Sequence, residues 1–75
     1  MLESIQVKMA RAALGWSGRE LADKSGVAAN TVARFEVGYD VMFDTAKRLQ
    51  TTLEKGGVIF IPRDANGGPG VRLKK

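Results

Sequence analysis

The residue types that most often carry catalysis or bind metals are scarce in this chain of 75 residues. It has no histidine and no cysteine, so the commonest general base, the commonest metal ligand and all thiolate chemistry are absent. No site with paired carboxylates is evident. The cluster Gly67-Gly68-Pro69-Gly70 does not link a strand to a helix, as a phosphate-binding loop would. The sequence therefore predicts a protein that is not an enzyme and that has no cofactor or metal.

The charged residues favour a polyanionic partner, although the excess is modest. Twelve Lys and Arg against eight Asp and Glu give a net charge of +4, and most of the excess lies in residues 51–75. No apolar stretch approaches the roughly 20 residues that span a bilayer, and no signal peptide is evident. We therefore expect a cytoplasmic protein with no membrane partner, and no small-molecule ligand is evident.

Apolar residues recur at helical spacing from Leu2 to Trp16, which predicts a first helix near the start of the chain. Two adjacent stripes form its apolar face: Val7, Ala10 and Leu14, and beside them Ile5, Met9 and Ala13. Gly15 is expected to end this helix. Trp16 precedes the next helix and is expected to belong to the core.

The next two helices are short and separated by a glycine. Ser17 and Glu20 fit the S-x-x-E capping box, in which each side chain satisfies an exposed backbone amide of the other, so a helix is expected over 18–24. Gly26 tolerates the positive φ of a tight turn. A third helix follows over about 28–37 and ends at Gly38.

Residues 39–43 form a loop with so many apolar side chains that we expect it to lie against the domain. Asp44 or Thr45 is expected to cap a fourth helix, which ends at Gly56-Gly57. Its buried positions are Ala46, Leu49 and Leu53.

The last part of the chain has the pattern of a β-hairpin. Residues 58–61 are an apolar, β-prone run, residues 63–70 are rich in turn formers, and residues 71–73 can form the return strand. A hairpin is therefore expected after the helices.

Residues 17–36 combine the features that two short helices need when they cross at a steep angle. Gly26 turns the chain, and Ala22 is small where the third helix crosses above it. Apolar residues fill the angle and lock the third helix to the core: Leu21, Val27, Val32 and Phe35. A generic pair of core helices in a small bundle is the alternative interpretation.

This pattern resembles the Cro and phage-repressor helix-turn-helix family, also called Xre-like, over about residues 3–56. The segment MARAALGWSGRELADKSGVAANTVARFEVG carries the resemblance. It implies a mainly α, compact four- to five-helix, lambda-repressor-like DNA-binding domain over residues 1–56, with the helix-turn-helix at 17–36. Residues 57–75 would be a β-strand or hairpin tail rather than a separate domain. The resemblance also implies a bacterial, phage or mobile-element origin.

The resemblance further implies that the third helix lies in the major groove of double-stranded DNA. Carried over by position, the residues facing base edges would be Ala28, Ala29, Asn30 and Arg34. Asn30 would bond adenine and Arg34 guanine, whereas the two alanines offer methyl contacts only, so DNA shape would contribute to specificity. A surface arginine at 34 and a locally bonded asparagine at 30 are the structural alternatives.

The same resemblance assigns contacts to the phosphate backbone and one internal ion pair. The phosphate contacts would come from Ser17, the Gly18 amide, Arg19 and Thr31. Gly18 stands where relatives often have glutamine, which removes one side-chain contact. Arg11 and Glu36 occupy positions that pair in relatives, and we expect the same pair here.

A homodimer is expected because a single copy with few base contacts would bind weakly. The tail supports this: Val58, Ile59, Phe60 and Ile61 are apolar on both faces of a strand, and a partner copy would cover the second face. A hairpin packed wholly on its own helices is the alternative. The resulting hypothesis is a homodimeric transcriptional repressor or autoregulator that binds a pseudo-palindromic operator. The alternative is a protein-interaction module of the antitoxin or anti-activator type on the same fold.

Overall fold

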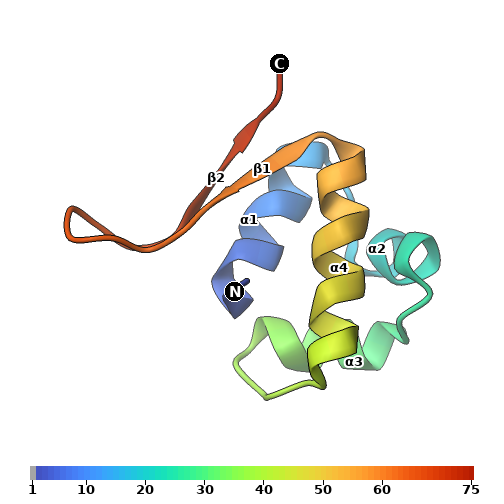
Figure 1. Cartoon of the computed structure of the whole chain (residues 1–75). Coiled ribbons are helices and arrows are strands. Elements are labelled where there is room, and N and C mark those ends of the chain that lie inside the picture. Colours follow the sequence, from blue (N-terminus) through green and yellow to red (C-terminus); the bar gives the residue numbers. More distant parts are fainter. Residues whose placement is uncertain (1) are drawn as a thin grey trace.

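The computed structural model describes residues 2–75, which form four helices followed by a hairpin (Figure 1). The elements are α1 (Ser4–Leu14), α2 (Gly18–Ser25), α3 (Ala29–Glu36), α4 (Phe43–Gly56), β1 (Val58–Ile61) and β2 (Gly70–Leu73). The predicted class, a mainly helical lambda-repressor-like domain with a C-terminal hairpin, is confirmed. In the described part of the chain, no helix is both long and apolar enough to cross a membrane.

Helix α1 buries a different set of residues from the one that the periodicity predicted. Val7 and Ala10 are fully buried and Leu14 packs at the edge of the core, as expected. The second stripe was wrong, because Ile5 is 44% exposed and Ala13 is exposed. Gln6 is buried instead, since its amide group binds the backbone of the hairpin. Gly15, with φ of 71°, ends the helix.

The turn between α2 and α3 has the predicted form. Gly26 ends α2 in the left-handed conformation with φ of 75°. Leu21 and Val32 are fully buried from the two helices, and Val27 in the turn is buried between them. The glycine turn and these buried contacts hold α3 across the end of the domain, beneath α2 and α4 in Figure 1.

The segment between α3 and α4 differs from both predictions made for it. The loop does not lie against the domain: Tyr39, Met42 and Phe43 are 55%, 75% and 67% exposed. The core-facing positions of α4 are already occupied by its own buried residues, and the loop runs round the outside (Figure 1). Helix α4 also begins earlier than predicted, with Met42 as an N-cap that makes no side-chain hydrogen bond. Asp44 is therefore not the cap but lies in the first turn, where a negative charge is favourable.

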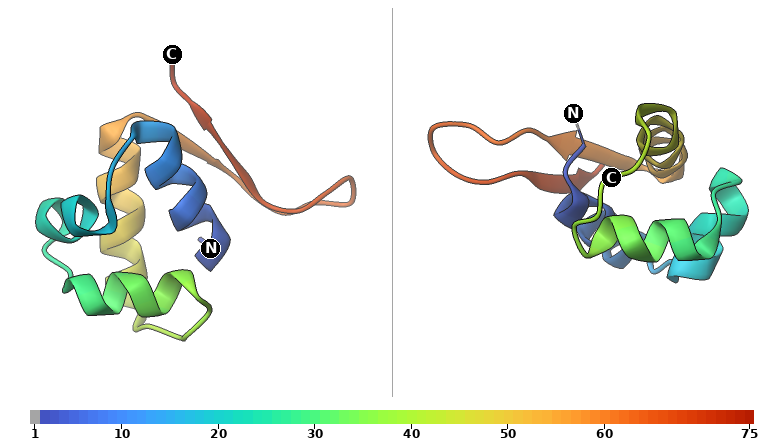
Figure 2. Two further views of the ribbon diagram at one scale, coloured as in Figure 1. Left: turned by 180° about the vertical axis from the view of Figure 1, so that it is seen from behind. Right: turned by 90° about the horizontal axis from the view of Figure 1, so that it is seen from below.

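The hairpin covers one side of the helical domain, and its loop extends beyond it (Figure 2). Strands β1 and β2 pair antiparallel, with Val58 opposite Leu73 and Ile61 opposite Gly70. Val58 is fully buried, and Phe60 packs on the core beside Val71. Side chains alternate along a strand, so Ile59 and Ile61 face outward and are about 40% exposed. At the tip, the Asp64 carboxylate accepts hydrogen bonds from the amides of residues 66 and 67 and closes the turn.

Candidate nucleic-acid interface

The N-terminus of α2 is closed by the predicted capping box. The Glu20 amide donates to Ser17 Oγ over 3.0 Å, and the Ser17 amide donates to Glu20 Oε1 over 2.9 Å. Ser17 and Arg19 are exposed, and Gly18 is partly exposed. The Glu20 carboxylate lies at this same end of the helix, and its charge opposes an approaching phosphate. Arg19 is therefore the side chain here that can attract one.

Helix α3 packs against α2 and leaves its other side exposed. Its inner side is fixed by Val32, which is 1% exposed, and by the half-buried Phe35. The four positions assigned to base edges, Ala28, Ala29, Asn30 and Arg34, are all exposed, and Thr31 is half-buried. Ala28 is the N-cap of α3 and makes no side-chain hydrogen bond, so the start of α3 is uncapped whereas the start of α2 is capped. The predicted contact residues of α2 and α3 thus lie at the surface of two helices that pack against each other.

Arg34 has a partner that the sequence did not suggest. Its guanidinium carbon lies 4.3 Å from the centroid of the Tyr39 ring, and the Tyr39 amide donates to the Arg34 carbonyl over 3.0 Å. Stacking of this kind holds the planar guanidinium in one orientation. Tyr39 follows Gly38, shortly after the end of α3. In the sequence, the only sign of this contact was an aromatic residue directly after the glycine that follows the helix. Tyr39 therefore belongs with the candidate interface.

The Arg11–Glu36 ion pair joins α1 to the end of α3. Arg11 Nε and Nη2 donate to the two Glu36 carboxylate oxygens over 2.6 and 2.7 Å, and Nη1 donates to the Trp16 carbonyl over 3.1 Å. The Glu36 side chain is only 7% exposed. Hydrogen bonding to Glu36 raises the pKa of Arg11, against the opposing effect of burial. One side chain thus holds α1, the segment before α2 and the end of α3 in a fixed relation.

The assigned dimer residues do not share one environment. Val58 and the inner side of Phe60 lie against the chain's own helices. Ile59 and Ile61 remain on the outer face, beside Arg72, which pairs with Ile59 across the hairpin. A second copy placed on this face would meet Ile59 and Ile61, but not Val58.

Gln6 is the structural residue that sequence reasoning missed. Its Nε2 donates to the carbonyls of Ile61 and Gly70 over 3.0 and 2.9 Å, and its Oε1 accepts from the Glu3 amide. A glutamine on an apolar face gives no clear signal, because its partners lie more than 50 residues away in the chain. Through Gln6 the hairpin is tied to α1.

Comparison with known proteins agrees with this geometry. A family model described as helix-turn-helix matches residues 7–57, about two thirds of the chain. No curated protein matches the chain. Members of the matched family are DNA-binding regulatory domains rather than typical enzymes. The fold and the site thus define a DNA-binding helix-turn-helix regulator. The chain belongs to the Cro and Xre-like helix-turn-helix family.

Proposed function

We propose that this chain is a sequence-specific transcriptional regulator that places α3 in the major groove of an operator. The observation that carries the proposal is the exposed pair Asn30 and Arg34 on α3, the second helix of the helix-turn-helix. In the proposed complex, Asn30 bonds an adenine edge, and Arg34 turns from the Tyr39 ring to a guanine. Ala28 and Ala29 add only methyl contacts, so the shape of the DNA supplies part of the specificity.

The proposed phosphate contacts lie at the two edges of this surface. Ser17, the Gly18 amide and Arg19 would bind one strand from the start of α2, and Thr31 would contribute from α3. Because Glu20 repels phosphate at the same end, Arg19 carries most of the attraction there. This arrangement predicts affinity that falls steeply with salt, with a slope of about −0.9 for each phosphate neutralised.

We further propose that the regulator acts as a homodimer and represses its own gene. Residues 1–56 would be the DNA-binding domain, and residues 57–75 would be the dimerisation element, with Ile59 and Ile61 meeting their counterparts across a two-fold axis. Two such copies would bind half-sites about one helical turn apart, roughly 10 base pairs from centre to centre.

Selection of duplexes from a random pool, followed by gel-shift titration, tests the DNA-binding proposal. We expect an enriched sequence with two inverted half-sites, and more than about tenfold weaker binding by the Asn30→Ala/Arg34→Ala double variant. Lys8→Gln, which also removes one charge but lies on the exposed side of α1, is the control and should bind nearly normally. Normal binding by the double variant, with an unchanged circular dichroism spectrum, would reject the proposed placement of α3.

The dimer has its own test in analytical ultracentrifugation. Ile59→Lys should weaken self-association and operator binding together, because it buries an unpaired charge in the proposed contact. A protein that is dimeric with either isoleucine or lysine at position 59 would place the interface elsewhere. Repression is tested separately, by expression of a reporter placed behind the upstream DNA of the gene.

A protein-interaction module of the antitoxin or anti-activator type is the second candidate function. Exposed apolar side chains in the α3–α4 loop and at the first position of α4 favour it: Tyr39, Met42 and Phe43. Their neighbours Asp40 and Asp44 are acidic, which suits a protein partner better than phosphate. A chain that enriches no DNA sequence, but forms a stoichiometric complex lost in Met42→Ser, would support this function instead.

A further inference from the structure

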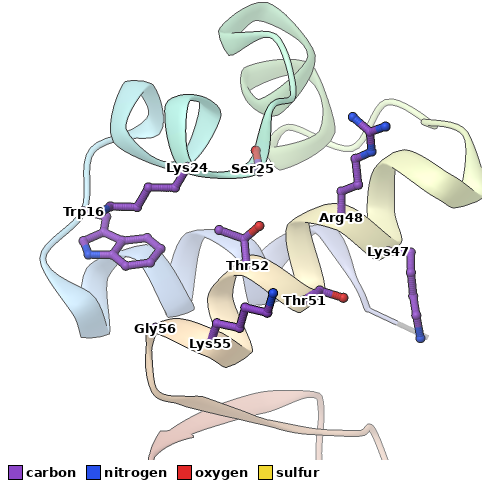
Figure 3. A pocket seen from close by; sticks show the side chains of 9 residues that line it. All are labelled: Trp16, Lys24, Ser25, Lys47, Arg48, Thr51, Thr52, Lys55 and Gly56. Carbon is purple, nitrogen blue, oxygen red and sulfur yellow. The ribbon is translucent and has the colours of Figure 1, made fainter.

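A groove of about 490 Å³ lies between the C-terminal half of α2 and the middle and end of α4 (Figure 3). None of the residues proposed to contact DNA lines it. It lies instead on the side of the domain where α4 faces α2, and the segment before α2 closes one end. A volume of this size is within the range of small-molecule sites, about 300–1,000 Å³.

Positive charge is concentrated along this groove. Its four charged lining residues are all basic: Lys24, Lys47, Arg48 and Lys55. Figure 3 shows Lys24 and Lys55 on opposite walls, from α2 and α4, whereas Lys47 points away from the cavity. Within residues 2–75 the ion pairs are Arg11–Glu36 and Arg63–Glu3, and neither involves a residue that lines the groove. Lysine and arginine side chains in this groove would attract an anion.

One wall of the groove is a fixed aromatic ring. The Trp16 indole lies so close to α4 that a Cβ atom built on Gly56 would be 2.6 Å from its Cη2 atom. The same atom would be 2.9 Å from a methyl group of Leu14, so the absence of a side chain at Gly56 lets the ring rest on the helix. The Lys24 ammonium lies 5.0 Å from the ring centroid, which holds one cation of the groove in place.

The other lining groups are hydroxyls. Thr51 and Thr52 on α4 supply two of them, and Figure 3 shows Thr52 directed toward α2 between the two walls. The third, Ser25 Oγ, already donates to the Ala22 carbonyl and accepts from the Val27 amide. Lysine, arginine and hydroxyl donors together are the groups that proteins use to bind phosphate oxygens. The indole adds an apolar surface beside the Lys24 ammonium. The groove therefore combines a phosphate-binding side with a planar, apolar side.

We propose that this groove binds a small phosphate-bearing molecule with a planar ring, of the nucleotide class. In the bound state, Lys24 and Lys55 bind the phosphate oxygens from opposite walls, and the ring lies toward Trp16. The length of the groove favours a small molecule over a nucleic-acid strand, because Arg48 and Lys55 are seven residues apart on a helix, about 10 Å. The proposal is independent of the proposed DNA contacts.

Titration of the intact protein with ATP, followed by tryptophan fluorescence, tests the proposal. Trp16 is the sole tryptophan, so the signal reports on the groove alone. We expect a saturable change with ATP. Tripolyphosphate, which has the charge without the ring, and adenosine, which has the ring without the charge, should each bind at least about tenfold more weakly. A linear change with ATP, or equal binding of tripolyphosphate and ATP, would overturn the proposed ligand class.

Variants at single lysines show whether the groove itself is the site. Lys55→Gln should weaken ATP binding about tenfold, since it removes a charge-assisted hydrogen bond. Lys8→Gln, which makes the same change on α1 outside the groove, should leave the affinity within about twofold. Equal losses in the two variants would mean diffuse attraction by net charge and would overturn the proposal. Thermal melts of both variants verify that the fold is retained, and calorimetry gives a second measure of affinity.

The DNA-binding variants separate this site from the proposed function. Asn30→Ala/Arg34→Ala should bind ATP as the parent protein does, because neither residue lines the groove. Lys55→Gln should retain operator binding within a few-fold. If Lys55→Gln instead abolished DNA binding and left ATP binding unchanged, the groove would be a DNA contact, and the nucleotide site would be rejected.

Discussion

The hairpin and the α3–α4 loop are both apolar segments, but they differ in how far their apolar side chains are buried. Val58 in the hairpin is fully buried, whereas Met42 in the loop is 75% exposed. The hairpin is held by Gln6, whose amide binds both of its strands, and by an ion pair from Arg63 to Glu3. The loop follows Gly38 and has no comparable anchor beyond the Arg34–Tyr39 stack. Apolar composition alone therefore does not decide burial; specific anchors to other elements do.

The largest expected effect comes from the buried end of the hairpin. Val58→Ala should lower the free energy of unfolding by about 2 kcal/mol, because it removes two methyl groups from a site with no exposed surface. Urea denaturation followed by circular dichroism measures this. A loss below about 0.5 kcal/mol would mean that β1 is not part of the core in solution.

The next effect concerns the polar anchor of the hairpin. Gln6→Ala should cost about 1–2 kcal/mol, because the carbonyls of Ile61 and Gly70 lose their common donor. Gln50→Ala is the matched control, since Gln50 bonds only the neighbouring Glu54 side chain on α4. If both variants lost equal stability in the same denaturation experiment, the special role of Gln6 would be wrong.

The loop should respond much less than the hairpin. Met42→Ser and Phe43→Ser each remove an exposed apolar side chain, so we expect the free energy of unfolding to stay within about 0.5 kcal/mol of the parent value. If either variant is destabilised as much as Val58→Ala, the loop contributes to the core in solution and its contrast with the hairpin is wrong. A destabilisation that grows with protein concentration would show instead that a second copy covers the loop.

The smallest effect is a change in the pKa of Glu3, which pairs with Arg63 in the loop of the hairpin. Hydrogen bonds from Arg63 hold the pKa of Glu3 below its ordinary value, although burial opposes this. A lowered folded-state pKa adds stability above the unfolded pKa, and this stability is lost as the pH falls through the folded pKa. NMR titration of the Glu3 carboxyl should show its pKa rising in Arg63→Gln and unchanged in Arg72→Gln. An unchanged pKa in the first variant would mean that the pair does not persist in solution.

The sequence determined the helix-turn-helix because its signals are local. The Ser17–Glu20 capping box and the turn at Gly26 depend on residues within four positions of each other, so they are visible without a fold. The family resemblance then predicted the Arg11–Glu36 pair, whose geometry the structure provides. The contacts of Asn30 and Arg34 with DNA stay predictions, because they depend on a partner that the sequence does not contain.

Only the tertiary structure decided how distant segments meet. In α1 the fold buries Gln6 and leaves Ile5 exposed, because the carbonyls that Gln6 binds belong to residues 55 and 64 positions further along the chain. It left the α3–α4 loop exposed, since α4 already presents its own core face. It also gathered Trp16, Lys24 and Lys55 from three separate segments around one groove. Such contacts between distant segments depend on packing across the whole domain, which local periodicity and capping signals do not encode.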